Sequence, residues 1–226
     1  MRMRMASVLS TAALALIFVG SASEMRADVI FSNFGPGQTY SGNQWWDVGT
    51  GTLGQQVVAF PFVPTTTGVL TGADLALAMQ LGSATPLNVF IESSSGGVPG
   101  SILDTLTQVG TIPTYPTTAV LNYTCSGSCT TLNAGTMYWI VGQQSNPAND
   151  TGWMWNNTGD TASWYFNEVN GATGPWSVAT TNNTVGAFDV TATPSNAPVP
   201  EPASLALLGS GLVGIMAAAR RKVWKR

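Results

Sequence analysis

The side chains best suited to binding chemistry are five aromatic residues that lie close together in the sequence. Trp153, Trp155, Trp164, Tyr165 and Trp176 are found among Asn, Thr, Gly and Asp residues. Flat aromatic faces next to amide and hydroxyl groups suit the rings of sugars. Trp153 and Trp155 are two positions apart and would share one face of a strand, as a sugar-binding platform requires. The alternative is that these rings form part of a hydrophobic core.

A second group of residues offers oxygen atoms to a cation. Asp150, Asn156 and Asp160 lie in one short segment that also contains Asn149 and Asn157. Carboxylate and amide oxygens are the ligands that Ca²⁺ prefers, although the spacing here matches no EF-hand loop. The sequence therefore admits a calcium site, with solvated loop acids as the alternative, and we expect no other cofactor.

Few residues in the chain could carry out catalysis. The sequence contains no His, and each of its eight Lys and Arg residues precedes Asp28 or follows Val199. The segment between these positions therefore lacks an imidazole base, a Schiff-base amine and a guanidinium clamp. A carboxylate pair such as Asp160 and Glu168 could hydrolyse glycosides only at a suitable separation. We expect no enzymatic activity and rank a glycoside hydrolase third among the possible functions.

The charged residues are segregated along the chain. Nine acidic and no basic residues lie between Asp28 and Val199, which gives this segment a formal charge of −9. Affinity for nucleic acid depends on Lys and Arg residues that neutralise phosphates. The composition therefore excludes nucleic acid as a partner.

Cys125 and Cys129 are the two cysteines, and they enclose the sequence Ser-Gly-Ser. A structural zinc site needs four ligands, and this pair has neither a second cysteine pair nor a histidine to complete one. In an oxidising compartment two such cysteines favour a disulfide, and Gly127 would allow the short loop to turn back. We predict a Cys125–Cys129 disulfide, with free or redox-active thiols as the alternative.

Residues 1–27 have the pattern of a secretory signal peptide. Arg2 and Arg4 precede an apolar stretch at 12–20 that is too short to span a bilayer. Small residues permit cleavage after Ala27 or near Ser23, and we favour Ala27 because a strand can then begin at Asp28. The alternative is a membrane anchor that is retained.

The C-terminal residues 200–226 combine three features. Val199-Pro200-Glu201-Pro202 precedes an uncharged stretch at 203–219, and a basic tail follows at 220–226. Seventeen mostly apolar residues are near the lower limit for a single transmembrane helix. The basic tail would stay in the cytoplasm, which places the preceding domain outside.

This tail resembles the PEP-CTERM sorting signal of Gram-negative bacteria that produce exopolysaccharide. The resemblance implies that an exosortase recognises the tail and cuts it near Pro200-Glu201-Pro202. The protein would be anchored transiently in the inner membrane and then passed to the envelope or the exterior. The alternative is a permanent single-pass anchor.

Residues 28–193 are expected to form one all-β domain, followed by a linker at 194–199. Short runs rich in Val, Ile, Phe and Tyr alternate with Gly, Pro, Asn and Ser, which predicts a jelly-roll-like antiparallel β-sandwich. The stretch 73–81 is the one helix candidate, and Val98-Pro99-Gly100 is predicted to be a turn. The expected strands are 28–31, 56–63, 69–81, 87–92, 102–109, 119–124, 137–142, 164–169 and 185–193.

Several segments of this domain resemble the choice-of-anchor class, specifically type R. They are Gly96-Gly97-Val98-Pro99-Gly100-Ser101-Ile102-Leu103, residues 132–141 (LNAGTMYWIV), and the region around Trp153 and Trp155. Such modules accompany interchangeable surface anchors, and the resemblance carries over no catalytic residues. The expected function is a non-enzymatic envelope or extracellular-matrix protein, with exopolysaccharide as a potential partner. The alternative is a surface carbohydrate-binding module.

Overall fold

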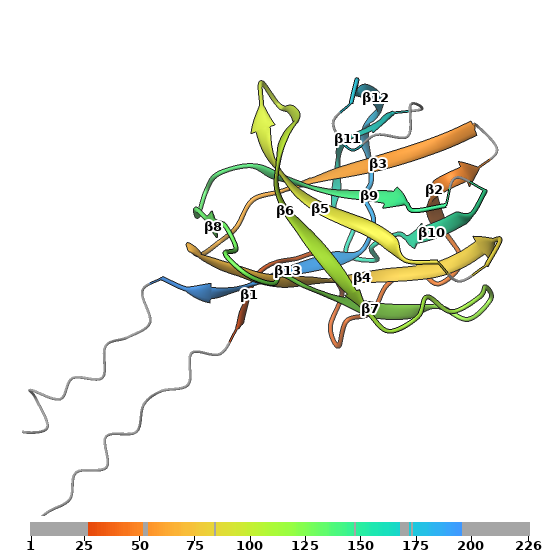
Figure 1. Ribbon diagram of the computed structural model, residues 1–226, viewed down its shortest axis with the longest axis horizontal. Coiled ribbons are helices and arrows are strands. Elements are labelled where there is room, and N and C mark those ends of the chain that lie inside the picture. The colour runs from red at the N-terminus through yellow and green to blue at the C-terminus, as the bar shows by residue number, and fades with distance from the viewer. Residues whose placement is uncertain are drawn as a thin grey trace, which may run out of the picture. The chain divides into compact units, whose positions relative to one another are not determined.

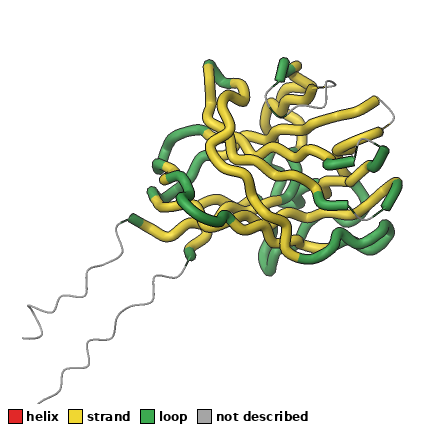
Figure 2. Tube along the Cα trace, viewed as in Figure 1, coloured by secondary structure: helices red, strands yellow, loops and turns green. Residues whose placement is uncertain are grey.

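The computed structural model describes residues 27–51, 54–83, 85–146, 148–167, 172 and 174–195, which contain strands and no helix (Figure 2). This confirms the all-β prediction and assigns the helix candidate at 73–81 to a strand. The strands are β1 Asp28–Ser32, β2 Trp45–Gly51, β3 Gly54–Phe62, β4 Gly68–Leu81, β5 Leu87–Ser95, β6 Val98–Val109, β7 Ala119–Thr124, β8 Thr131–Leu132, β9 Tyr138–Gln144, β10 Asp150–Met154, β11 Thr161–Asn167, β12 Ser177–Thr184 and β13 Phe188–Pro194.

Eight of these strands form a closed antiparallel ring. Their order is β4-β10-β2-β3-β9-β5-β6-β7, and β7 pairs again with β4. Closure depends on β6, which pairs with β5 and then with β7 and runs diagonally between them (Figure 1). A closed ring leaves fewer unpaired strand edges than an open sheet. The antiparallel arrangement agrees with the expected class, whereas the jelly-roll connectivity stays a prediction.

Two long strands of the ring also pair with strands outside it. One edge of β4 pairs with β13 and then with β10, and β13 pairs in turn with β1. One edge of β3 pairs with β2 and then with β11, and β11 pairs in turn with β12. We call β4 with β13, β7, β10 and β2 the β4 wall, and β3 with β11, β9 and β5 the β3 wall.

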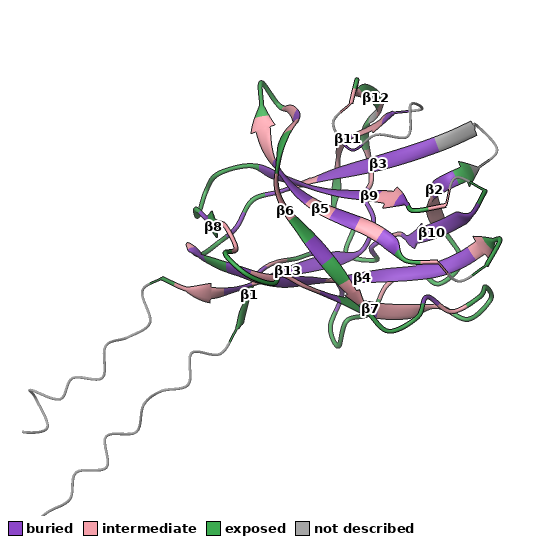
Figure 3. Cartoon of the chain, viewed as in Figure 1, coloured by how far each residue is buried: buried purple, intermediate pink, exposed green. Residues whose placement is uncertain are grey.

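The main core lies between the two walls and follows the alternation of side chains along each strand. Leu75, Leu77 and Met79 of β4 face inward, as do Phe60 and Ile140 on the β3 wall. Most residues of β3, β4, β9 and β10 are buried (Figure 3). Because alternate side chains of a strand face opposite sides, a second set points outward on each wall.

Trp153 is the largest side chain at the centre of this core. Its ring lies 4.9 Å from that of Phe60, and its indole nitrogen donates to the Ala187 carbonyl at 3.0 Å. Gly186 leaves room for the indole, since a Cβ there would lie 2.6 Å from the Trp153 ring. This position explains why Trp153 is not available at the surface.

The outward set on the β3 wall confirms the predicted alternation in β9. Tyr138 and Ile140 belong to the main core, whereas Trp139 and Val141 pack in a separate outer cluster with Val57 and others. On the β4 wall the outer cluster contains Ala76, Ala78 and Met154, together with Phe34 from the loop after β1. The domain therefore has apolar packing on both faces of its sheets.

The turn predicted at Val98-Pro99-Gly100 lies two residues earlier. Gly96 and Gly97 have φ angles of 64° and 85°, and Ser95 pairs with Val98 across the hairpin. A two-residue hairpin loop with positive φ at both positions favours glycine strongly. Val98-Pro99-Gly100 is already the start of β6. The predicted position was wrong because it relied on Pro99 as the turn residue, whereas Gly96 and Gly97 form the turn.

Predictions about the two ends of the chain lie mainly outside the described residues. This holds for the signal segment 1–26 and for the linker from residue 196, the Pro200-Glu201-Pro202 motif, the stretch 203–219 and the basic tail. Ala27 is exposed, and β1 begins at Asp28, which confirms the predicted strand, whereas the cleavage point stays a prediction. Among the described residues, no helix has the length and apolar character needed to cross a membrane.

Candidate functional site

The five aromatic residues proposed as a sugar platform are divided between different faces. Trp153 and Trp164 are 0% and 4% exposed and belong to the main core. Tyr165 and Trp176 pack instead on the outer face of the β3 wall, where Tyr165 lies 5.3 Å from Trp139. Trp155 is half-buried against Trp46, with 5.1 Å between their rings. These five side chains therefore do not form one surface, because neighbouring residues of β11 face opposite sides.

The three residues proposed as calcium ligands are also not brought together. Asn156 is buried and organises the turn that follows it, where its Oδ1 accepts from the backbone nitrogens of Thr158, Gly159 and Asp160. Its Nδ2 donates to the carbonyls of Asp160 and Val185. Asp160 has an exposed side chain, whereas Asp150 lies at the opposite end of β10. The Asn156 oxygen is thus already engaged in its own turn.

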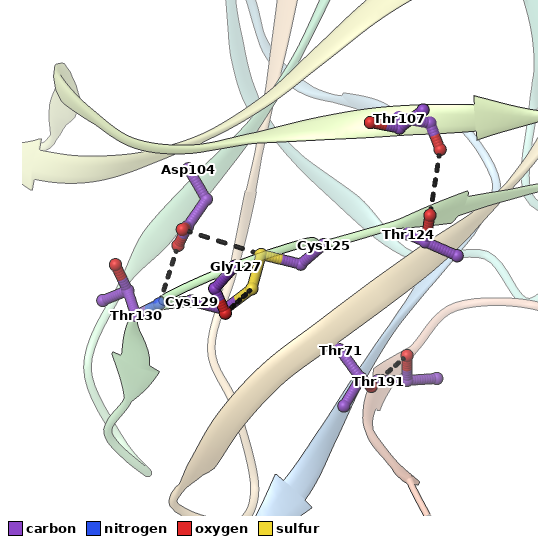
Figure 4. The surroundings of a disulfide bond; sticks show 9 residues. All are labelled: Thr71, Asp104, Thr107, Thr124, Cys125, Gly127, Cys129, Thr130 and Thr191. Carbon is purple, nitrogen blue, oxygen red and sulfur yellow. Dashed lines mark hydrogen bonds between the residues drawn. A yellow bond between two sulfur atoms is a disulfide. The ribbon is translucent and has the colours of Figure 1, made fainter.

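The predicted disulfide between Cys125 and Cys129 is present, with an S–S distance of 2.03 Å (Figure 4). Gly127 has a φ of 87°, as the expected reversal of the loop requires. Asp104 of β6 lies beside the bridge, where its carboxylate accepts from the Thr130 nitrogen at 3.1 Å and lies 3.7 Å from the Cys125 sulfur. Both sulfurs are bonded to each other, so this group offers no thiolate to a metal.

Of the carboxylates proposed for catalysis, Glu168 is outside the described residues. The structure shows a different acidic pair on the outer face of the β4 wall, formed by Asp47 of β2 and Asp150 of β10. Both positions lie beside Gly152, since Asp47 pairs with Gly152 across the strands and Asp150 is two residues away on the same face. This pair is the starting point of the candidate site.

The side chain of Trp45 packs over the backbone of Gly152 on the outer face of the sheet. A Cβ at Gly152 would be 2.8 Å from Cγ of Trp45 and 2.6 Å from Nε2 of Gln80, so both side chains occupy the space that this glycine leaves. The Trp45 indole nitrogen donates to Oδ1 of Asp47 at 2.9 Å, which fixes the orientation of the ring. We call Trp45, Asp47, Gln80, Tyr115 and Asp150, gathered around Gly152, the Trp45 face.

Tyr115 reaches this face from the segment between β6 and β7. The Met79 nitrogen donates to the Pro113 carbonyl at 2.8 Å, and the Tyr115 nitrogen donates to the Met79 carbonyl at 2.9 Å. These bonds attach the segment to the edge of β4. The Tyr115 ring lies 5.1 Å from that of Trp45, at an interplanar angle of 51°. Tyr115 is 37% exposed, so the aromatic pair is open to solvent on one side.

Gln80 lies on this face because it is two residues beyond Ala78, which belongs to the outer cluster of the β4 wall. Asp150 pairs with Leu81 and Thr151 pairs with Met79, which leaves Gln80 as the extra residue of a β-bulge without a directly paired partner on β10. The Nε2 atom of Gln80 and the Oδ1 atom of Asp150 are buried and have no hydrogen-bond partner. The face therefore contains one unused donor and one unused acceptor.

The carboxyl group of Asp150 has a shifted pKa. Burial, the charge of Asp47 and a hydrogen bond between the two carboxyls together raise the pKa of Asp150 to about 7, and a backbone hydrogen bond at Val48 opposes them. Like charges this close disfavour double ionisation. At neutral pH Asp150 is therefore protonated for part of the time.

A second acidic pair on the β4 wall is fully engaged within the protein. Asp189 accepts from the backbone nitrogen of Asp74, and Gln38 donates to both carboxylates at 3.1 and 3.3 Å. Asn122 donates to Asp74 at 2.9 Å. Burial, followed by the charge of Asp74, raises the pKa of Asp189 to about 6. These amide donors make this pair a structural crosslink between β4 and β13.

Glu92 of β5 is an isolated buried acid. It is 0% exposed, both of its carboxyl oxygens lack a hydrogen-bond partner, and it pairs with Trp139 across the strands. Burial raises the pKa of Glu92 to about 8, so the group is mainly protonated at neutral pH. No second carboxylate is paired with it among the described residues.

Sequence reasoning missed the Trp45 face, although part of the signal was present. Trp45-Trp46-Asp47-Val48 alternates in the manner of a strand, which places Trp46 and Val48 inside and Trp45 and Asp47 outside. The proximity of Asp47 to Gly152 is set by pairing between strands about a hundred residues apart. No local pattern indicates that pairing.

Comparison with known proteins identifies one feature of the chain. A family model described as the PEP-CTERM protein-sorting motif matches residues 198–222. No curated protein matches the chain. The match confirms the resemblance of the C-terminal tail, indicates an exported protein with a C-terminal sorting signal, and supports an exosortase as a partner.

Proposed function

We propose that this protein is a non-enzymatic component of the cell envelope or extracellular matrix that an exosortase processes and sorts. The observation that carries the proposal is the sorting motif at residues 198–222. It follows directly on the strand-rich domain, whose last described residue is Ser195. The basic residues after position 219 suit retention of the tail on the cytoplasmic side until cleavage.

Two further observations support the extracytoplasmic destination. A disulfide is typical of proteins that fold in oxidising compartments, and Cys125 and Cys129 form one. The domain between Asp28 and Val199 contains acidic residues and no basic ones, a distribution that keeps a secreted protein soluble and away from anionic polymers. We propose a Gram-negative envelope as the setting, with transient anchoring through residues 203–219 before cleavage.

The finer classification as a choice-of-anchor domain of type R, with jelly-roll connectivity, is part of this proposal. It rests on the segments 96–103 and 132–141, which form the β5–β6 hairpin and the approach to β9. The absence of His, Lys and Arg from this part of the chain supports a non-enzymatic role. Exopolysaccharide is the partner that this setting suggests.

The sorting proposal is tested by changing the motif in cells that carry an exosortase. In the triple variant Pro200→Ala, Glu201→Ala, Pro202→Ala, we expect the full-length chain to accumulate in the inner membrane. The unchanged protein should appear as a shorter form in the outer envelope or the medium. The measurement is cell fractionation with intact-mass analysis of each fraction.

A matched control changes Ser195→Ala and Asn196→Ala, which lie just before the matched residues. This variant should be cleaved and sorted like the unchanged protein. Equal retention of all three proteins in the inner membrane would contradict the role of the motif, as would equal processing of the triple variant.

A further inference from the structure

We propose that the Trp45 face binds a neutral saccharide, whose ring packs on Trp45 and Tyr115 while its hydroxyl groups bond to Asp47 and Gln80. This inference goes beyond sorting and envelope location, since it assigns a ligand to the domain itself. It also places saccharide binding on a different wall from Tyr165 and Trp176.

Trp45 is a half-buried aromatic ring that is held in place and partly accessible. The Trp45 ring packs on the backbone of Gly152, and its indole nitrogen is hydrogen-bonded to Asp47. The side chain therefore loses little conformational entropy when a ligand binds. Tyr115 stands beside it at 5.1 Å and is 37% exposed. The apolar C–H face of a sugar ring packs on such surfaces, and Trp and Tyr supply large contact area at low entropic cost.

The Trp45 face also has hydrogen-bonding groups that the protein does not use. A sugar hydroxyl both donates and accepts, and this face offers a carboxylate and an amide on either side of Gly152. Nε2 of Gln80 has no partner within the protein, and Gln80 is half-buried. Rotation about the soft terminal torsion of its side chain can therefore present the amide to a ligand. Buried polar groups without partners are unfavourable, so a ligand that pairs them gains affinity.

The charge of the domain restricts the class of saccharide. Asp47 and Asp150 lie on the face itself, and no basic residue occurs between Asp28 and Val199. An acidic sugar such as a uronate would be repelled and would find no Arg or Lys to pair with. The inferred ligand is therefore a neutral saccharide.

The test uses the full-length chain, purified in detergent, and two probes. The probes are a panel of neutral hexaoses built from glucose, mannose or galactose, and hexagalacturonate as the acidic counterpart. Isothermal titration calorimetry in EDTA should show binding of at least one neutral hexaose and none of the acidic one. Trp45→Ala and Tyr115→Ala should each weaken that binding about tenfold.

Two controls separate binding from folding. Tyr165→Ala removes an aromatic side chain from the β3 wall and should leave the affinity unchanged. Gly152→Ala should weaken binding, because its Cβ would displace Trp45 and Gln80. Unfolding curves establish that each variant is folded, and Tyr115→Ala carries the test if Trp45→Ala is not, because Tyr115 is exposed.

Three outcomes would overturn the proposal. They are no binding of any neutral hexaose, binding that both Trp45→Ala and Tyr115→Ala leave intact, and binding that appears only with added Ca²⁺. The last would assign the acidic pair to a cation. Because sorting is measured in cells and binding on purified protein, failure here leaves the sorting proposal standing.

Discussion

Gly152 shows how a residue without a side chain can create a surface. A Cβ at this position would lie within 3 Å of Trp45, Gln80 and Met154. Side chains from three strands therefore pack together over the backbone of Gly152, where no side chain of its own covers the sheet. At the scale of single residues, the candidate site depends as much on this gap as on the groups around it.

Glu92 illustrates the opposite case, a polar group placed where nothing in the protein pairs with it. Burial favours its neutral form, and ionisation would put a charge into an apolar environment. The variant Glu92→Gln keeps the shape of the protonated acid and removes the ionisation. We expect it to be more stable than the unchanged protein by about 1–2 kcal/mol at pH 8.5 and nearly equal at pH 5.

Denaturant unfolding at the two pH values measures this difference. The matched control is Asp28→Asn, which changes an exposed acid at the start of β1 and should show no such dependence. If Glu92→Gln and the unchanged protein differ by the same amount at both pH values, the carboxyl is not protonated in the folded state.

At the scale of elements, the short disulfide loop joins β7 to β8. Closing a five-residue ring restricts the unfolded chain and contributes about 2 kcal/mol in the chain-entropy description. The double variant Cys125→Ser, Cys129→Ser should therefore lower Tm by roughly 4–8 °C without changing the fold. Differential scanning calorimetry gives Tm, and circular dichroism checks the strand content.

Treatment with a reductant is the control for the disulfide variant. It should lower Tm of the unchanged protein by a similar amount and leave the double variant unaffected. A loss of all strand structure in the variant would show that the loop is needed for folding of the domain. That result would contradict the expectation that losing the ring lowers the stability of the domain without changing its fold.

The elements that sequence reasoning found are those with strong apolar alternation. β7 was predicted at its observed bounds, and β4 and β13 within a few residues. β2, β8, β10 and β12 were not among the expected strands. β12 is rich in Asn and Thr, and β10 contains Asp150 and Gly152, so neither shows a clear apolar period. β10 is nevertheless fully buried, because it pairs with β2 and β4 from distant parts of the sequence.

The candidate site was less predictable than the fold for the same reason. The sequence identified aromatic and acidic residues as the relevant types, and Asp150 was among the candidates. It placed the sugar platform at Trp153, which the structure buries at the centre of the core. Whether a Trp faces inward or outward depends on strand register, and a change of one residue reverses it. The register of β2 against β10 is set by the closed ring.

At the scale of the whole molecule, the charge distribution predicts how stability depends on pH. Burial raises the pKa values of Asp150, Asp189 and Glu92 to about 7, 6 and 8. Asp47 faces Asp150. Asp74 and Gln38 contact Asp189, and Asn122 contacts Asp74. No cation is available to any of them between Asp28 and Val199. All three shifts therefore act in the same direction.

The direction follows from proton binding in the two states. Between about pH 4 and 8 the folded protein holds protons that the unfolded chain has released, so the free energy of unfolding decreases as pH rises. The stabilisation is complete below the unfolded pKa values near 4 and is lost as pH passes through the folded values of about 6 to 8. A loss of about 3 kcal/mol between pH 5 and 8.5 corresponds to a Tm lower by roughly 6–12 °C.

Calorimetric scans across this range measure the effect, and scans in high salt separate it from general repulsion among the nine acids. Repulsion among exposed acids is screened by salt, whereas the cost of ionising a buried carboxyl persists. We therefore expect most of the decrease in Tm to remain at high ionic strength. A Tm that rises from pH 5 to 8.5, or a decrease that salt abolishes, would show that the buried acids are ionised in the folded protein. In that case the acidic residues would affect the solubility of the protein, and burial of carboxyl groups would not explain how its stability depends on pH.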